Sequence, residues 1–374
     1  MQDELLAMEA NRPWSVMPLP QGQHSIGFKW IYKIKYRTDG TIDRYKAGSA
    51  QSFVALLVYI VDIVITGASL PVLHKIKDHL HEAFKLKDLG SLRYFLGLEI
   101  ARSSQGILLS QRNYTLQLLE DHGLLACKPA SLPLDSALKL QFDVGTLLSD
   151  ATLYRRLIGR LLYLTISRPD IAFVVHKLSQ FVAQPRQPRL DAAMSLLKYL
   201  KASPGQGILL QLVHTFQLKA YFDADWGSCP DSRKSITGFC IFLGDFIISW
   251  KAKKKSTVSR SSAKAEYQAL AATISELLWV EQLLHELSVP LIHPSLIYCD
   301  NEATVHIAEN PVFHERTKHI DCHFVRDHIV RDNVKLLPIR SHLQLADIFT
   351  KALPKTLFSS LLSKMGILDI TTPS

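Results

Sequence analysis

Apolar and polar residues alternate along residues 218–223, with the two-residue period of a strand that buries one face. Every second residue from Leu218 to Phe222 is apolar, and the strand ends at Asp223 and Asp225. Acidic side chains are unfavourable in strands unless something at that position requires them. We therefore regard Asp223 as the first candidate site residue.

The pattern after this strand predicts further elements over residues 208–353. Residues 236–243 are expected to form a second strand, which turns at Gly244 and Asp245 into a third at 246–250. A long helix begins near Ser262 because apolar residues then recur on one face. Beyond Pro290, which ends that helix, we expect a strand to Cys299, a short helix from Glu302, a helix near 322–331, a strand at 334–339 and a helix from about Leu343. Antiparallel strands followed by helices alternating with strands predict an α/β domain with a mixed sheet.

The first half of the chain has a different pattern. The apolar run at 53–67, interrupted by Asp62, predicts a buried hairpin, and residues 26–37 alternate apolar with basic side chains. This earlier ribbon has two open interpretations, a phosphate-contacting surface or an ordinary edge strand protected by lysines. The remaining expectations are a helix at 71–86, strands at 94–100 and 106–109, a helix at 114–123, a linker at 128–133, and two helices between 154 and 202 separated at Pro185 and Pro188.

Composition narrows the class of protein. With 374 residues, 47% of them hydrophobic and 21% charged, the chain is expected to be globular with two or three domains. Its net charge of +9 favours an anionic partner such as nucleic acid, although many basic proteins bind none. The five cysteines are odd in number and widely spaced, which favours a reducing, intracellular compartment. We expect no signal peptide, no transmembrane segment and no membrane partner.

Four acids stand where predicted elements begin or end: Asp223, Glu266, Asp300 and Asp347. Hydrolysis of a phosphodiester needs an activated water and stabilisation of the leaving oxygen, and two Mg²⁺ ions can supply both. Mg²⁺ prefers carboxylate oxygens, so acids converging from several elements are the expected ligands. Each acid alone is more typical of a turn or a helix terminus than of a metal ligand. Only the ordered set predicts a metal-dependent nuclease site.

Several motifs resemble one known family. They are GFKWIYK at 27–33, KDLG at 87–90, YFLGLE at 94–99, LLYL at 161–164, SRPDI at 167–171, DADW at 223–226, SRSSAKAEY at 259–267, HERTKH at 314–319 and LADIFTK at 345–351. Through them, residues 1–354 resemble the reverse transcriptase–RNase H region of the Pol polyprotein of Ty1/copia-type retrotransposons, of the kind abundant in plants.

The resemblance implies an α/β (α+β) organisation in four parts. These are a truncated reverse transcriptase fingers and palm remnant at 1–130, a helical thumb or connection at 131–215, an RNase H-like mixed-sheet domain at 216–354, and a C-terminal tail at 355–374. It implies that Asp223, Glu266, Asp300 and Asp347 hold two Mg²⁺ ions and that the substrate is an RNA–DNA hybrid. It also implies a location in the cytoplasm or a virus-like particle. The other Pol and Gag products are absent from this chain.

The polymerase half departs from the family pattern. The family has a long palm stretch after residues 44–47, including a catalytic Asp, whereas this chain passes almost directly to Phe53. The family's Tyr-x-Asp-Asp turn is also degenerate, because Val61 stands between Tyr59 and Asp62 where an acid is expected. Valine offers no oxygen to a metal ion. We therefore expect that DNA synthesis is lost.

A basic run precedes Glu266, and it contains no acid. Its members are Lys251, Lys253, Lys254, Lys255, Arg260 and Lys264. Such a run is unremarkable as a solvated loop, but beside four acids it is expected to hold a nucleic-acid backbone. Two hypotheses follow: a Mg²⁺-dependent ribonuclease H carried on a degenerate reverse transcriptase, or a non-catalytic relic that only binds nucleic acid or has no activity.

Overall fold

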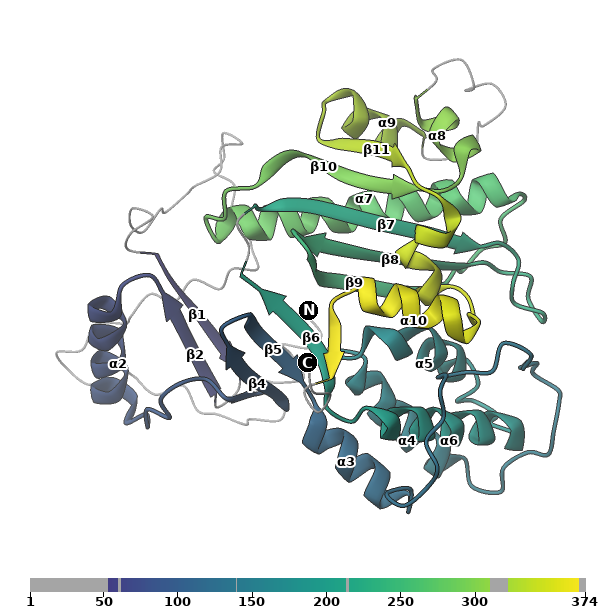
Figure 1. The fold of residues 1–374 in the computed structure, drawn as a ribbon, viewed down its shortest axis with the longest axis horizontal. Helices are drawn as coiled ribbons and strands as arrows, with labels where there is room; N and C mark the ends of the chain where they lie inside the picture. Colours follow the sequence, from purple (N-terminus) through teal and green to yellow (C-terminus); the bar gives the residue numbers. More distant parts are fainter. Residues whose placement is uncertain (1–52, 60–61, 139, 213–214, 310–321, 370–374) are drawn as a thin grey trace, which may run out of the picture.

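The computed structural model describes residues 53–59, 62–138, 140–212, 215–309 and 322–369, which form three β-sheets and the helices around them (Figure 1). The ribbon expected at 26–37 lies outside these residues. In the first half the elements are β1 (Val54–Tyr59), β2 (Asp62–Gly67), α2 (Leu70–Phe84), β3 (Tyr94–Phe95), β4 (Leu98–Ser103), β5 (Gly106–Ser110), α3 (Arg112–Asp121), α4 (Ala151–Leu164), η2 (Pro169–Ile171), α5 (Ala172–Ser179), α6 (Gln187–Ala202) and β6 (Gln206–Gln211).

The second half contains the sheet that carries the acids. Its elements are β7 (Gln217–Asp225), β8 (Ile236–Leu243), β9 (Phe246–Lys254), α7 (Ser262–Glu286), β10 (Ile292–Cys299), α8 (Glu302–Glu309), α9 (Cys322–Val330), β11 (Val334–Pro338), η4 (Ser341–Leu343), η5 (Leu345–Phe349), α10 (Lys355–Lys364) and β12 (Ile367–Asp369). The strand order is β11–β10–β7–β8–β9. Strands β7, β8 and β9 are antiparallel, while β10 joins β7 and β11 joins β10 in parallel. This confirms the expected α/β fold with a mixed sheet.

Strand β8 is buried on both faces of the sheet. Its successive side chains point to opposite faces and so belong to two separate hydrophobic cores. Phe239 and Ile241 pack with apolar residues of α7 on one face of the sheet. Cys240 and Phe242 belong to the other core, together with residues of α4, α5, α6 and α10. A strand covered on both sides should be apolar at nearly every position, and all eight residues of β8 are buried. The helical region of the first half is therefore packed directly against the acid-bearing sheet (Figure 1).

The chain after residue 354 was predicted to be a tail, and this is wrong for the part that the structure describes. Residues 355–364 form α10, whose Phe358 and Leu361 are buried, and β12 follows. Strand β12 pairs with β6 at one edge of the five-stranded sheet β12–β6–β5–β4–β3. This sheet draws strands from both halves of the chain (Figure 1), so the pattern of one segment alone did not reveal it.

The hairpin of β1 and β2 forms as predicted, but it is not buried. Leu57 and Tyr59 are 55% and 50% exposed, and Asp62 is exposed opposite Tyr59. The two strands make a sheet of their own. The apolar run predicted the two strands correctly but their burial wrongly: residues 54–56 of β1 are half-buried, and residues 57–59 at its end are exposed.

Two helices were expected between residues 154 and 202, and three are found. The additional break lies at Arg168–Pro169, where η2 separates α4 from α5. The guanidinium of Arg168, buried here, donates to both oxygens of Asp170. A proline and a buried ion pair at this point explain why the helix does not continue. Among the described helices, none is both long and apolar enough to cross a membrane.

His176 on α5 gives a pH-dependent stability prediction. Burial, together with the charges of Lys253 and Lys254, lowers the pKa of His176 below its usual 6.5. Its Nε2 accepts a hydrogen bond of 2.8 Å from the backbone N–H of Lys254, which protonation would break. The unfolded chain therefore binds the proton first, and stability falls as the pH drops below 6.5. In urea unfolding, the free energy of unfolding of wild type should fall relative to that of His176→Gln as the pH is lowered. A difference between the two proteins that stays constant with pH would contradict this.

Candidate active site

Strand register places Asp223 and Asp300 side by side. Tyr221 on β7 is paired in parallel with Tyr298 on β10, and each acid lies two residues further along its chain. Asp223 is only 3% exposed, and Asp300 directly follows the end of β10. Neighbouring parallel strands end at the same edge of a sheet, so the pairing itself brings the two acids together.

Glu266 enters the site from α7, which packs across the sheet. The helix is capped by Ser261, whose side chain accepts a hydrogen bond of 3.2 Å from the backbone N–H of Lys264. Glu266 was expected in the first turn but lies at the start of the second. It is 6% exposed, and its Oε1 accepts a hydrogen bond of 3.2 Å from the backbone N–H of Ala224. The carboxylate is thus fixed one residue away from Asp223.

Asp347 was predicted to lie in a helix, but it lies in the 3₁₀ turn η5. This turn approaches β8 closely at Gly238, the residue paired with Asp223. A Cβ atom at Gly238 would lie 2.7 Å from both Phe349 and Thr350 side chains. Only glycine leaves room for the turn there. The approach brings Asp347, itself 7% exposed, against the end of β7.

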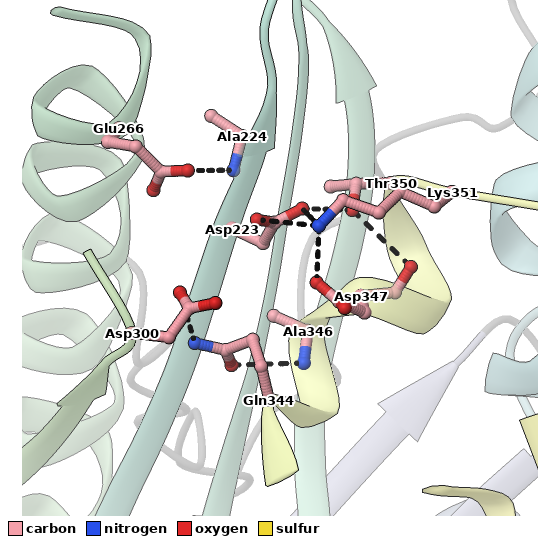
Figure 2. Close-up of polar contacts among 9 residues, drawn as sticks. All are labelled: Asp223, Ala224, Glu266, Asp300, Gln344, Ala346, Asp347, Thr350 and Lys351. Carbon is pink, nitrogen blue, oxygen red and sulfur yellow. Dashed lines mark hydrogen bonds and ion pairs between the residues drawn. The ribbon is translucent and has the colours of Figure 1, made fainter. Parts of the chain in front are cut away.

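Lys351 and Thr350 complete the site and were not among the predicted site residues. The Lys351 ammonium donates to Asp223 Oδ1 at 3.2 Å and to Asp347 Oδ1 at 2.7 Å. The Thr350 hydroxyl donates to Asp223 Oδ2. Figure 2 shows this ammonium between the two carboxylates, with Glu266 and Asp300 reaching in from two further elements. The spacing of Lys351 four residues after Asp347 was the signal available in the sequence.

The four acids repel one another electrostatically. Burial raises the pKa of Glu266 to about 8, and the charges of Asp223 and Asp300 add to this. Burial and Asp223 raise the pKa of Asp347 to about 6, against the opposing effect of Lys351. Asp300 accepts a hydrogen bond of 3.4 Å from Gln344 Nε2. A concentration of buried negative charge of this kind is typical of sites that bind a cation or move a proton.

The donor set fits a hard divalent cation such as Mg²⁺. It consists of carboxylate oxygens, and Glu266 Oε2 is buried without a hydrogen-bond partner. Within the described ranges, however, no three His, Cys, Asp or Glu side chains are grouped closely enough to hold a metal ion. The ammonium of Lys351 stands between Asp223 and Asp347 in this arrangement.

Asp225, the second acid of the strand, is not part of this set of contacts. Burial raises the pKa of Asp225, and the negative charge of Asp223 adds to the rise. Preferring Asp223 over Asp225 as the site residue remains a prediction.

The six predicted nucleic-acid-binding cations differ in their surroundings. Lys251, Lys253 and Arg260 are exposed. Lys254 donates to the sulfur of Cys229 at 2.9 Å, and Lys255 donates to a backbone carbonyl of α7 at 3.4 Å. Lys264 is half-buried. The three exposed side chains are the better candidates for contacting a phosphate backbone.

The turn at residues 59–62, which the sequence suggests is a degenerate polymerase turn, is only partly within the described residues. Tyr59 is paired with Asp62 across the hairpin, and Val61 lies outside the described ranges. Asp62 is exposed at the start of β2. Asp62, the one acid expected to remain in this turn, is therefore exposed, whereas a metal ligand is usually buried.

The chain is similar in sequence to reverse transcriptases and to Pol polyproteins of plant transposons. A family model for reverse transcriptase (RNA-dependent DNA polymerase) matches residues 42–136. The retrovirus-related Pol polyprotein from transposon RE1 of Arabidopsis thaliana is 42% identical over 319 residues, which are 85% of this chain and 22% of that protein. The Pol polyprotein from transposon TNT 1-94 of Nicotiana tabacum is 32% identical over 327 residues, 84% of this chain and 24% of that protein.

A shorter relative is covered nearly completely. An uncharacterized mitochondrial protein of Arabidopsis thaliana is 42% identical over 225 residues, 60% of this chain and 93% of that protein. Solved structures are more remote. The foamy viral protease-reverse transcriptase in complex with RNA/DNA hybrid has a TM-score of 0.43 at 12% identity, covering 80% of this chain and 37% of that chain. That likeness is too weak to bear on function.

A reverse transcriptase-type segment is thus followed by an α/β region with a buried acid cluster. Over most of its length the chain is similar to the Pol polyproteins of plant retrotransposons, and residues 42–136 match the reverse transcriptase family model. The chain spans about a fifth of the length of the Pol polyproteins that it matches.

Proposed function

We propose that residues 216–354 act as a Mg²⁺-dependent ribonuclease H that cuts the RNA strand of RNA–DNA hybrids. The proposal is supported by the electrostatic coupling of Asp223, Glu266, Asp300 and Asp347, which come from distant parts of the chain, and by the raised pKa values of Glu266 and Asp347. Burying several carboxylates together is unfavourable unless a cation compensates them. Proteins keep such unfavourably buried carboxylates mainly at functional sites, where catalysis or cation binding requires them.

The reaction adds water across a phosphodiester bond. The water oxygen bonds to phosphorus, the bond from phosphorus to the ribose 3′ oxygen breaks, and a proton passes to that oxygen. The four acids would hold two Mg²⁺ ions, which when bound activate water and stabilise the leaving oxygen. The protein contributes fixed carboxylates: Ala224 N–H holds Glu266, and the Thr350 hydroxyl holds Asp223.

Substrate recognition would rest on shape and charge. Lys251, Lys253 and Arg260 are exposed on or just after β9 and before α7, where they would contact phosphates of the hybrid. Recognition of this kind uses backbone and 2′-hydroxyl contacts with little reading of bases. Binding should therefore weaken steeply as salt concentration rises.

A labelled RNA–DNA hybrid incubated with the protein and Mg²⁺ tests the proposal. We expect cleavage of the RNA strand in the hybrid, and none in an RNA duplex or after chelation of the metal. Absence of hybrid cleavage by folded protein at low salt would instead support the non-catalytic relic, an alternative favoured by the exposed apolar hairpin β1–β2.

We further propose that the polymerase half is inactive, with a division near residues 130 and 215 separating it from a helical connection and the nuclease part. Two-metal nucleotide transfer needs several oxygen ligands, and the turn offers Asp62 alone, exposed on a two-stranded sheet.

Primer extension measures this directly. Purified protein given an RNA template, a DNA primer, nucleotides and Mg²⁺ should leave the primer at its original length, while a competent reverse transcriptase in parallel extends it. Replacing Val61 by Asp should not restore synthesis, because the family's palm stretch before Phe53 would still be missing. Any extended product from the wild-type chain would contradict the prediction.

A further inference from the structure

We propose that Lys351 is a built-in counter-ion of the acid site, which a divalent metal ion must displace, so that this lysine sets the metal concentration at which the site fills. The inference deepens the proposed function and rests on it only in treating the same four acids as a cation site. It concerns a residue outside the predicted ligand set and a property, metal affinity, that can be measured without substrate.

The contacts of Lys351 match those of an ion bound between two carboxylates. Its Nζ lies 3.2 Å from each of the two Asp223 oxygens and 2.7 Å from Asp347 Oδ1. An ammonium group has three N–H donors, and three carboxylate oxygens are within reach of it. The lysine thus uses oxygens that a bridging metal ion would need.

Simultaneous occupation is electrostatically unfavourable. Asp223 and Asp347 would have to offer a metal ion carboxylate oxygens that now accept from the ammonium of Lys351. Four carboxylates already balance the charge of two divalent ions. A retained ammonium would add an uncompensated positive charge in a region where Asp223, Glu266 and Asp347 are buried and charge repulsion is poorly screened.

Lys351 can leave the site without unfolding it. Its side chain is 38% exposed, in contrast to the 4% and 10% of its two partners. A lysine has a flexible stem and a compact charge, so it can turn toward solvent or toward a phosphate of the substrate when metal binds. The two acids, by contrast, are fixed by β7 and η5.

Lys351 should therefore raise the stability of the metal-free protein and lower its affinity for metal ions. In the absence of metal the ammonium offsets the repulsion between Asp223 and Asp347, so removing it should destabilise the protein. In the presence of metal its absence removes a competitor, so the same change should strengthen metal binding. A lysine with only a structural role would predict the first effect without the second.

The test is Mg²⁺ titration of substrate-free protein by calorimetry and by thermal unfolding. Lys351→Met should melt below wild type without metal, yet reach half-saturation at an Mg²⁺ concentration on the order of tenfold lower. Lys351→Arg keeps the charge and binds carboxylates through a planar fork, so it should need more Mg²⁺ than wild type. Lys355→Met, an exposed lysine four residues on, controls for the loss of a positive charge and should match wild type.

The outcomes separate this inference from the proposed function. An unchanged or higher half-saturation concentration in Lys351→Met overturns the inference, even if wild type cleaves hybrids. A lower concentration supports it, even if wild type cleaves nothing. If Lys351→Met does not fold, the Lys351→Arg titration decides, and half-saturation at or below the wild-type concentration overturns the inference. Failure of Mg²⁺ and Mn²⁺ to bind wild type and both Lys351 variants overturns both the inference and the metal-dependent function.

Discussion

Glu266→Gln should reduce cleavage of an RNA–DNA hybrid by on the order of a thousandfold, the cost of removing one charged group from a preorganised site. Glutamine has the same shape, and its carbonyl oxygen can still accept the hydrogen bond from Ala224 N–H. What it lacks is the negative charge required to hold a cation. The variant therefore separates the charge of Glu266 from its place in the packing of α7 against β7.

Stability measurements distinguish this from a folding defect. Because the pKa of Glu266 is raised in the fold from 4.5 to about 8, the stability that this group contributes is full below pH 4.5 and is lost as the pH rises toward 8. Glutamine cannot ionise, so without metal the variant should be at least as stable as wild type near pH 8. A less stable variant would mean that reduced cleavage reflects unfolding.

A matched substitution on the same helix completes the experiment. Glu286 is exposed at the end of α7 and accepts a hydrogen bond from Gln282, one turn earlier. Glu286→Gln removes the same charge far from β7 and should retain full cleavage. Equal cleavage by wild type and Glu266→Gln would remove Glu266 from the proposed site, whereas equal loss in both variants would point to the charge of the helix in general.

The acid-bearing sheet was predictable because its local signals agree with its fold. Alternation in β7, the turn at Gly244–Asp245 and the apolar stripe of α7 each predict the element that forms. Once β10 pairs in parallel with β7, the position of Asp300 beside Asp223 follows from counting residues. Local pattern and long-range pairing reinforce one another here, as expected for a sequence that specifies one structure.

The features that were missed depend on contacts between distant segments. Lys351 joins Asp223 across 128 positions of sequence, and strand β12 pairs with β6 across the whole acid-bearing region. No periodicity encodes such a partner. The β1–β2 hairpin is the opposite case: its apolar residues predict burial, but the residues at the end of β1 are exposed. Burial depends on neighbours, and pattern alone cannot supply them.

Asp170→Asn should destabilise the protein by about 3–5 kcal/mol, the cost of leaving a buried charge without its partner. Arg168 and Asp170 have side-chain exposures of 1% and 0%. Asp170 Oδ2 also accepts hydrogen bonds from the Tyr199 hydroxyl at 2.7 Å and from Gln206 Nε2 at 3.1 Å. The network ties η2 to α6 and β6, at the centre of the core that supports the acid-bearing sheet. Asparagine keeps the shape but leaves the guanidinium uncompensated.

A double substitution and an exposed pair show whether burial is the cause. Arg168→Met combined with Asp170→Asn removes both charges, so it should recover part of the stability lost in Asp170→Asn alone, giving a coupling of at least about 1 kcal/mol in a double-mutant cycle. The exposed pair of Arg160 and Asp121, 2.5 Å apart with side-chain exposures of 22% and 49%, is the comparison. Asp121→Asn should cost under about 1 kcal/mol. Urea unfolding of wild type, Asp170→Asn, the single variant Arg168→Met, the double variant and Asp121→Asn measures all these terms. Equal costs for Asp170→Asn and Asp121→Asn would show that the buried ion pair is no more important to the fold than one at the surface.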